Sequence, residues 1–230
     1  PATFDPETRY TLSINGLHDE LGQSLSYRST TFRTQAFEPR VNMDRGMMVI
    51  EADQQAVVPV QATNTESVQL GLERLSANEI VPALPTYDRR THYDREDADA
   101  KRPPVEADRT YELPIERNTL ATVPLRLDSL LTGQTGVVGV RLIRPKLHEY
   151  YDTDLRALAQ VTHLGVTGKF SPHQNLITVT SLKDGTPVEG ATVTIRDANN
   201  DVYWRGATDE KGRAQTPGWH ALGIEKTDEY

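Results

Sequence analysis

A short run of acidic and amide residues is the strongest candidate for chemistry in this 230-residue sequence. Asp197, Asn199 and Asp201 alternate as the oxygen ligands of a calcium loop do. A helix–loop–helix calcium site, however, needs glycine at the sixth position of its loop and glutamate at the twelfth. Val202 and Thr208 occupy those positions. We therefore predict a hairpin loop whose Asp and Asn side chains bond their own backbone.

The histidines and the acidic runs offer no recognisable catalytic or metal-binding pattern. His163 and His173 flank a predicted strand and its turn, whereas His92 and His148 lie far apart in the sequence. No pair has the spacing of zinc ligands, and no carboxylate obviously accompanies one. The acidic run Asp94–Asp97 could serve acid–base chemistry only if it were buried, and we expect it to be solvated. We find no nucleophile elbow and no glycine-rich phosphate loop, so we assign no catalytic, cofactor or metal residues.

Aromatic residues form the remaining candidate site. Trp204 and Trp219, with Tyr203, could stack on a sugar, but a large aromatic residue in a strand more often packs in a core. Tyr203 and Trp204 must point to opposite faces of their strand, so we expect one to be buried and the other exposed. Four tyrosines in or near predicted linkers could pack domains together or contact a partner: Tyr87, Tyr93, Tyr150 and Tyr151.

Composition excludes several classes of function. The chain has no cysteine, which rules out disulfides, thiolate catalysis and zinc–thiolate sites within it. Its net charge of −8 argues against a nucleic-acid partner, because phosphate neutralisation needs clustered Lys and Arg. The hydrophobic content of 37% suits sandwiches whose strands bury only alternate residues. No apolar run is long enough to span a bilayer.

Alternating strand patterns divide the sequence into three predicted units. Residues 1–36 carry two strand-like runs, at 9–14 and 26–33, joined by a turn at Asp19–Gly22. Residues 37–147 contain four strand-like runs at 57–64, 67–75, 121–130 and 136–145, and a polar insertion at about 85–109 that we expect to be exposed. Residues 148–230 form the third unit, which we expect to be incomplete at its C-terminal end. We find no convincing amphipathic helix; the nearest candidate is Leu155–Ala159.

Turn signals are densest between Val161 and Gly218. The runs LITVTSL, ATVTIRD and DVYWRGAT are separated by Lys183-Asp184-Gly185, Val188-Glu189-Gly190 and Asn199-Asn200-Asp201. A further turn, Asp209–Gly212, favours a left-handed glycine that closes a hairpin. This spacing predicts an antiparallel β-sandwich, and we predict an all-β chain of tandem sandwiches of the immunoglobulin or fibronectin type III kind.

The segments LGVTGKFS, VTSLKDGTPVEGATVTI and GATDEKGRAQTP together resemble a macroglobulin-like domain of bacterial alpha-2-macroglobulins. The region 37–147 is more weakly similar to a preceding macroglobulin-like domain. Residues 1–36 look like the closing strands of a bacterial immunoglobulin-like domain. We therefore expect this sequence to be part of a longer protein.

The resemblance implies a function for the parent protein. Family members are broad-spectrum protease inhibitors that trap a protease after it cuts a bait segment. They are periplasmic and often lipid-anchored to a membrane, and many carry a thioester formed from a Cys-x-Glu-Gln motif. This sequence has no cysteine and cannot contain that motif. The resemblance implies a non-catalytic section without cofactors, whose partners are neighbouring macroglobulin-like domains and, through the whole protein, proteases.

A cell-surface adhesin or carbohydrate-binding module is the alternative interpretation. Rows of exposed aromatic side chains or a calcium site would favour it. An enzyme is the least supported class, because these residues do not assemble into a polar constellation.

Overall fold

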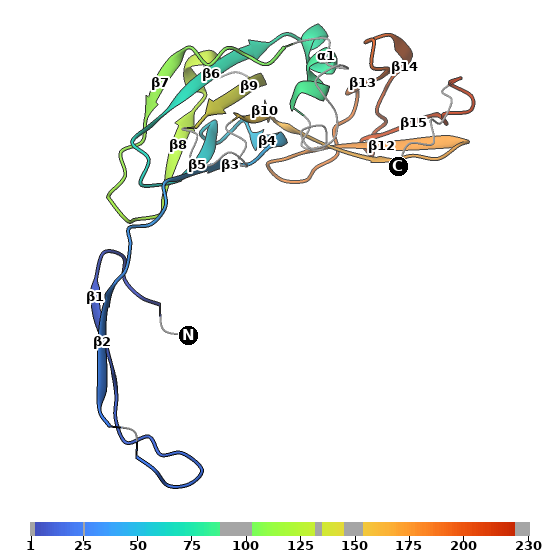
Figure 1. Ribbon diagram of the computed structural model, residues 1–230. Coiled ribbons are helices and arrows are strands. Elements are labelled where there is room, and N and C mark those ends of the chain that lie inside the picture. The colour runs from blue at the N-terminus through green and yellow to red at the C-terminus, as the bar shows by residue number, and fades with distance from the viewer. Residues whose placement is uncertain (1–2, 25, 88–102, 132–134, 145–153, 224–230) are drawn as a thin grey trace.

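The computed structural model describes residues 3–24, 26–87, 103–131, 135–144 and 154–223, and these form three units (Figure 1). A β-hairpin lies at the N-terminal end, a β-sandwich in the middle and a smaller β-unit at the C-terminal end. Strands account for 51% of the structure and helices for 8%, which confirms the all-β prediction. None of the helices in the described part of the chain has the length and apolarity that a membrane-spanning helix needs.

The N-terminal hairpin consists of β1 (Arg9–Ile14) and β2 (Arg28–Arg33), which pair antiparallel. It projects away from the middle sandwich (Figure 1). Tyr10 lies opposite Phe32, and both rings contact Phe4 at centroid distances of 4.8 and 5.5 Å. Leu12 lies on the same face as Tyr10 because alternate residues of a strand share a face. This apolar face is largely uncovered: Phe4 is 56% exposed and Leu12 is 53% exposed.

The middle sandwich packs a three-stranded sheet against a five-stranded sheet. The smaller sheet has the order β3 (Arg40–Met43), β5 (Val57–Thr63), β8 (Ala121–Arg126). The larger has the order β4 (Gly46–Glu51), β10 (Asp154–Thr162), β9 (Gly136–Ile143), β6 (Ser67–Leu75), β7 (Arg109–Glu112). All neighbours are antiparallel except β4 and β10, which run parallel.

The core of this sandwich follows the period-two pattern of its strands. Val58 and Val60 of β5 face Val138 and Val140 of β9, and all four are fully buried. The alternation of apolar and polar residues in the sequence therefore gives each sheet one apolar face, and the two apolar faces pack against each other. A short helix, α3 (Asp128–Leu131), follows β8 and adds the buried Leu131 to the same core.

The outer face of the five-stranded sheet is covered by a helix that the sequence analysis missed. α1 (Ala77–Tyr87) contains Pro82 and Pro85, and proline inside a helix removes a backbone hydrogen bond and ordinarily interrupts it. Its start is nevertheless capped: the carboxylate of Glu79 accepts a hydrogen bond from the Ser76 N–H at 2.8 Å. Burial of Ala83 and Tyr87 against the sheet stabilises the helix. The prediction that no helix of useful length exists was wrong, because tertiary packing outweighs the cost of the prolines.

The C-terminal unit contains two small antiparallel sheets. One has the order β11 (Leu164–Lys169), β12 (Gln174–Ser181), β15 (Arg213–Pro217), and the other pairs β13 (Thr192–Arg196) with β14 (Val202–Ala207). Its buried apolar residues are few: Ile177, Val179 and Ala214. The same sheet buries Asn175, whose amide donates to the Thr216 hydroxyl and the Pro217 carbonyl at 3.0 and 2.8 Å.

Strand pairing moves the predicted boundary between the second and third units. The sequence pattern predicted that the third unit begins at residue 148, but β10 pairs with β4 and β9 of the middle sandwich. Its Leu155 and Val161 are buried in the middle core. Leu155–Ala159, the nearest helix candidate, is therefore strand. Alternation identifies a strand but not the sheet that it joins, and strand pairing puts the boundary at His163.

Candidate functional site

The candidate calcium loop is a hairpin turn, as predicted. The Asp197 carboxylate oxygen Oδ1 accepts hydrogen bonds from the backbone N–H groups of Asn199 and Asp201, both at 2.8 Å. Asn200 takes the left-handed conformation with φ of 73°. Within the described residues, no group of three or more His, Asp or Glu side chains could hold a metal ion.

The same turn geometry recurs in two other hairpins. Oδ1 of Asp209 accepts from the backbone of Lys211 and Arg213, with Gly212 left-handed at φ of 68°. Oδ1 of Asp19 likewise accepts from the residues two and four positions later. The left-handed conformation predicted for Gly212 is confirmed. These aspartates shape turns, because Oδ1 of each accepts hydrogen bonds from backbone N–H groups of its own turn.

Two of the histidines acquire neighbours that the sequence did not reveal. His163 Nδ1 lies 3.5 Å from an oxygen of Asp53, and both side chains are exposed. The ring of His173 lies perpendicular to that of His220, with centroids 6.0 Å apart. His92, His148 and the acidic run 94–97 lie outside the described residues.

The aromatic candidates do not form a common platform. Tyr203 is 41% exposed, and Trp204 is half-buried over Gly206. The pairing of β13 with β14 shifts register at Tyr203, so strict alternation does not hold there. Of the predicted buried and exposed pair, Tyr203 is exposed but Trp204 is only half-buried. Tyr87 is buried and packs on the outer face of the large sheet, whereas Tyr93, Tyr150 and Tyr151 lie outside the described residues.

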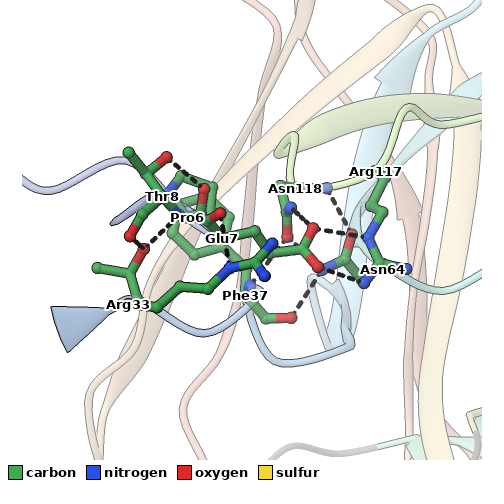
Figure 2. Close-up of polar contacts among 9 residues, drawn as sticks. Pro6, Glu7, Thr8, Arg33, Phe37, Asn64, Arg117 and Asn118 are labelled. Atoms are coloured by element: carbon green, nitrogen blue, oxygen red, sulfur yellow. Dashed lines mark hydrogen bonds and ion pairs between the residues drawn. The ribbon is translucent and has the colours of Figure 1, made fainter. Parts of the chain in front are cut away.

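A polar network joins the N-terminal hairpin to the middle sandwich, and we call its residues Glu7, Asn64, Arg117 and Asn118 the joint (Figure 2). The guanidinium of Arg117 donates two hydrogen bonds to the Glu7 carboxylate, at 2.9 and 2.8 Å. Asn118 Nδ2 donates to the same carboxylate at 2.7 Å. A forked guanidinium–carboxylate pair fixes orientation as well as distance.

The two asparagines of the joint bond each other across adjacent turns. The Asn118 backbone N–H donates to Asn64 Oδ1 at 2.6 Å, and Asn64 Nδ2 donates to Asn118 Oδ1 at 3.0 Å. Both also hold the backbone of Phe37. Asn64 Nδ2 donates to the Phe37 carbonyl at 2.6 Å, and the Phe37 N–H donates to Asn118 Oδ1 at 3.0 Å. The asparagines thus fix the segment that leaves the hairpin.

The hairpin holds Glu7 from the other side. The Glu7 N–H donates to the Gln35 carbonyl at 3.3 Å, and Arg33 Nε donates to the Glu7 carbonyl at 3.1 Å. Thr34 and Thr8 bond reciprocally beside it. Because both backbone and carboxylate of Glu7 are engaged, this single residue couples the two units.

Three of the four residues of the joint have an unusual backbone conformation that their hydrogen bonds must hold in place. Glu7, Asn64 and Asn118 have φ angles of 52°, 45° and 60°. They are three of the four non-glycine residues with positive φ in the described chain, and the fourth is Asn200. Asparagine tolerates this region, but glutamate rarely adopts it. Such conformations persist only where surrounding contacts hold them.

Electrostatics favour the charged form of Glu7. Hydrogen bonds from Arg117 and then Asn118 lower the pKa of its carboxyl from 4.5 to about 2, against a small opposing effect of desolvation. The pKa of the Arg117 guanidinium is raised by the same hydrogen bond. The joint is therefore fully charged at neutral pH and suited to holding two units in a fixed orientation.

Sequence reasoning missed the joint because its members are far apart in the chain. The only available signal is the Asn-Thr dipeptide, which occurs at Asn64-Thr65 and Asn118-Thr119, each following a polar residue between strand-like runs. Asparagine in a turn favours the left-handed conformation. That signal predicts a turn and says nothing about which turns meet.

A second charged cluster lies on the outer face of the large sheet. Arg141 and Arg156 are direct cross-strand partners on β9 and β10, and the carboxylate of Asp154 accepts hydrogen bonds from both, at 2.7 and 2.9 Å. Burial raises the pKa of the Asp154 carboxyl, but the two arginines outweigh it and the net pKa lies below its usual value. Asp154 offsets the repulsion between the two adjacent arginine side chains, so we infer that the cluster stabilises the sheet.

Comparisons with known proteins agree with the resemblance found in the sequence. Residues 161–229 match the family described as the bacterial alpha-2-macroglobulin MG3 domain. No curated protein sequence matches the chain.

Solved structures of bacterial alpha-2-macroglobulins share the fold. Native alpha-2-macroglobulin from Escherichia coli spanning domains MG0-NIE-MG1 is 19% identical with a TM-score of 0.59, over 94% of this chain and 69% of that one. A shorter piece spanning NIE-MG1 is 17% identical with a TM-score of 0.59, over 79% of this chain and 88% of that one. Salmonella alpha-2-macroglobulin reacted with methylamine is 15% identical with a TM-score of 0.58, over 94% of this chain but only 13% of that one. At these identities the likeness establishes the fold, and it covers a small part of a much longer protein.

Proposed function

We propose that this chain is a non-catalytic structural section of a bacterial alpha-2-macroglobulin, a protease inhibitor that traps proteases after bait cleavage. The observation that carries the proposal is the match of residues 161–229 to the bacterial alpha-2-macroglobulin MG3 domain. The fold likeness over 94% of the chain to a native alpha-2-macroglobulin structure from E. coli supports it.

The N-terminal hairpin is, in this proposal, part of a preceding domain of the parent protein. An isolated two-stranded hairpin is marginal in water, and this one exposes an apolar face that includes Phe4 and Leu12. The E. coli structure that includes MG0 matches 94% of the chain, whereas the one without it matches 79%. The difference, 15% of 230 residues, is about 35 residues, close to the length of the 1–36 unit.

The C-terminal unit also presents an apolar surface that a complete sandwich would cover. Val166 of β11 lies opposite the buried Val179 of β12, and cross-strand partners share a face. Val166 is nevertheless 67% exposed. We interpret this exposed edge as the place where further strands of the same macroglobulin-like domain pack.

The task of such a section is mechanical. The joint holds the hairpin against the middle sandwich through charge-assisted hydrogen bonds (Figure 2), and the middle sandwich has its own core. Its partners would be neighbouring macroglobulin-like domains and, through the complete protein, proteases. A periplasmic location and a lipid anchor outside this section follow from the family resemblance and belong to the same proposal.

Trapping can be tested on the complete parent protein. The protein is incubated with several unrelated proteases, and residual activity is measured on a small chromogenic peptide and on a large protein substrate. We expect cleavage of the small substrate to persist while cleavage of the large one falls, because a trapped protease admits only small molecules. Undiminished activity on the large substrate with every protease would refute the proposal.

The adhesin or carbohydrate-binding alternative has less support. Trp204 is half-buried rather than exposed beside Tyr203, and the Asp197 loop bonds its own backbone. Binding of this chain to a glycan array would favour the alternative.

A further inference from the structure

The connection between the middle sandwich and the C-terminal unit is a single residue. β10 ends at Thr162 and β11 begins at Leu164, so only His163 lies between them. The Thr162 carbonyl accepts from the Ala52 N–H of the middle sandwich at 3.0 Å. The His163 carbonyl accepts from the Leu182 N–H of the C-terminal unit at 2.8 Å. Across the connection, the Leu164 N–H donates to the Thr162 hydroxyl at 3.1 Å. The carbonyls on the two sides are otherwise bonded within their own units, so a rotation between the units concentrates at His163.

Contacts across this connection are sparse compared with those of the joint. Near His163, the exposed carboxylate of Asp53 lies 3.5 Å from the His163 ring and 3.8 Å from Lys183 Nζ. Neither hydrophobic cluster of the described residues contains a residue beyond Val161. The two units therefore share no apolar core, and exposed ion pairs hold little orientation by themselves.

One further contact lies away from the connection. The tip of the β13–β14 hairpin approaches the start of α1 (Figure 1), and Asn200 Nδ2 donates a hydrogen bond to the Asn78 carbonyl at 3.2 Å. In a regular helix that carbonyl would accept from the residue four positions later. That residue is Pro82, which has no N–H. Pro82 thus leaves the Asn78 carbonyl without its helical donor, and the Asn200 side chain of the C-terminal unit donates to it instead.

The conformation of Asn200 matches this role. Its φ of 73° places it at the tip of the turn that Asp197 organises, so its side chain is presented by a firmly bonded loop. A single exposed hydrogen bond of this kind changes an equilibrium by a factor of about two to ten. Such a contact can hold one orientation and still release it.

We propose that the C-terminal unit pivots as a body about His163, and that the bond from Asn200 to the Asn78 carbonyl is a latch that holds its docked orientation. The hinge is a property of this chain and holds whether or not the parent protein traps proteases. The joint at Glu7 is, by contrast, the rigid connection of the chain. One section would then combine a fixed and a movable link.

Pulsed electron–electron double resonance on the chain tests the hinge. The sequence has no cysteine, so spin labels can be placed at Thr122→Cys on β8 and Lys211→Cys on the β14–β15 turn, both exposed. We expect a main docked distance and a minor second one. Asn200→Gly keeps the left-handed backbone but lacks the amide, and should raise the ratio of the second population to the first about fivefold.

Asn78→Ala is the matched control. It removes the exposed Asn78 side chain but leaves the carbonyl that Asn200 uses, so the distance distribution should not change. Far-UV circular dichroism and tryptophan fluorescence confirm that each variant is folded. One narrow distance that Asn200→Gly leaves unchanged would overturn the hinge, and an equal change in both variants would overturn the latch. Neither outcome bears on the trapping assay with the parent protein.

Discussion

Gly139 provides a sharp test of how α1 packs on the middle sandwich. It lies in β9, on the outer face of the sheet, where a Cβ atom would be 2.6 Å from Tyr87 Oη and 3.1 Å from Tyr87 Cζ. Tyr87 is 3% exposed, and its hydroxyl accepts a hydrogen bond from the Val105 N–H at 3.2 Å. The buried ring therefore cannot move aside without disturbing α1 or the segment at Val105.

The expected cost of Gly139→Ala follows from two opposing effects. Overpacking a well-packed site costs about 1–3 kcal/mol. Replacing a strand glycine with alanine returns about 0.5–1 kcal/mol by restricting the unfolded chain. We therefore expect the middle sandwich to lose about 1–2 kcal/mol in its free energy of unfolding.

A double-mutant cycle with Tyr87→Phe isolates the clash. Removing the hydroxyl costs about 1 kcal/mol through the lost Val105 hydrogen bond, but it also removes the 2.6 Å contact. Gly139→Ala should then cost about 1 kcal/mol less in the Tyr87→Phe background, where only the 3.1 Å approach to the ring carbon Cζ remains. The resulting coupling, about 1 kcal/mol, is the signature of a direct contact between the two positions.

The structure also supplies an internal control for the assay. Both tryptophans, Trp204 and Trp219, lie in the C-terminal unit, so tryptophan fluorescence reports that unit alone. Urea unfolding monitored by amide hydrogen exchange in β9 and β10 reports the free energy of unfolding of the middle sandwich. If the costs of Gly139→Ala and Tyr87→Phe simply add, the two positions are not in contact and the packing argument is refuted. A change confined to the fluorescence transition of the C-terminal unit would also refute it.

Three further predictions concern the joint, the charged cluster and one turn. Glu7→Gln should broaden the spin-label distance between the hairpin and the middle sandwich, whereas Glu20→Gln in the hairpin turn should not. Because the pKa of Glu7 is lowered, its contribution is complete above pH 4.5 and is lost as the pH falls through about 2, which a pH series of the same distance checks. Asp154→Asn should cost the middle sandwich about 2–3 kcal/mol in urea unfolding by leaving two half-buried arginines without their carboxylate; a loss below about 0.5 kcal/mol would contradict this. In Gly212→Ala the new Cβ would lie 2.4 Å from a backbone oxygen, whereas in Gly185→Ala, at a similar positive φ, it would meet open space. Gly212→Ala should therefore destabilise the C-terminal unit by at least about 1 kcal/mol more than Gly185→Ala. Equal losses of stability, measured by tryptophan fluorescence, would contradict the clash.

Local patterns in the sequence predicted much of the fold correctly. The runs at 9–14, 57–64 and 67–75 are strands in the structure, because period-two alternation is a property of neighbouring residues. The turn at Asp197 was predicted for a similar reason, since its hydrogen bonds join residues two and four positions apart.

Two features escaped prediction because they depend on contacts between distant residues. α1 forms despite Pro82 and Pro85 because Tyr87 and Ala83 are buried on the sheet, and no local pattern predicts that burial. β10 was assigned to the wrong unit because its alternation fits either sheet, and only pairing with β4 and β9 decides between them.

The sequence by itself determined most of the strands, the turns, the absence of cysteine and the resemblance of the C-terminal unit to a macroglobulin-like domain, but not β3, β4 or β7. Only the tertiary structure brought Glu7 to Arg117 and Asn118, 110 and 111 residues away. Only the tertiary structure brought Asn200 to the carbonyl that Pro82 leaves without its helical donor. Strands and turns follow from interactions within a few residues, whereas the rigid and movable links between units arise from side chains that meet only after each unit has folded.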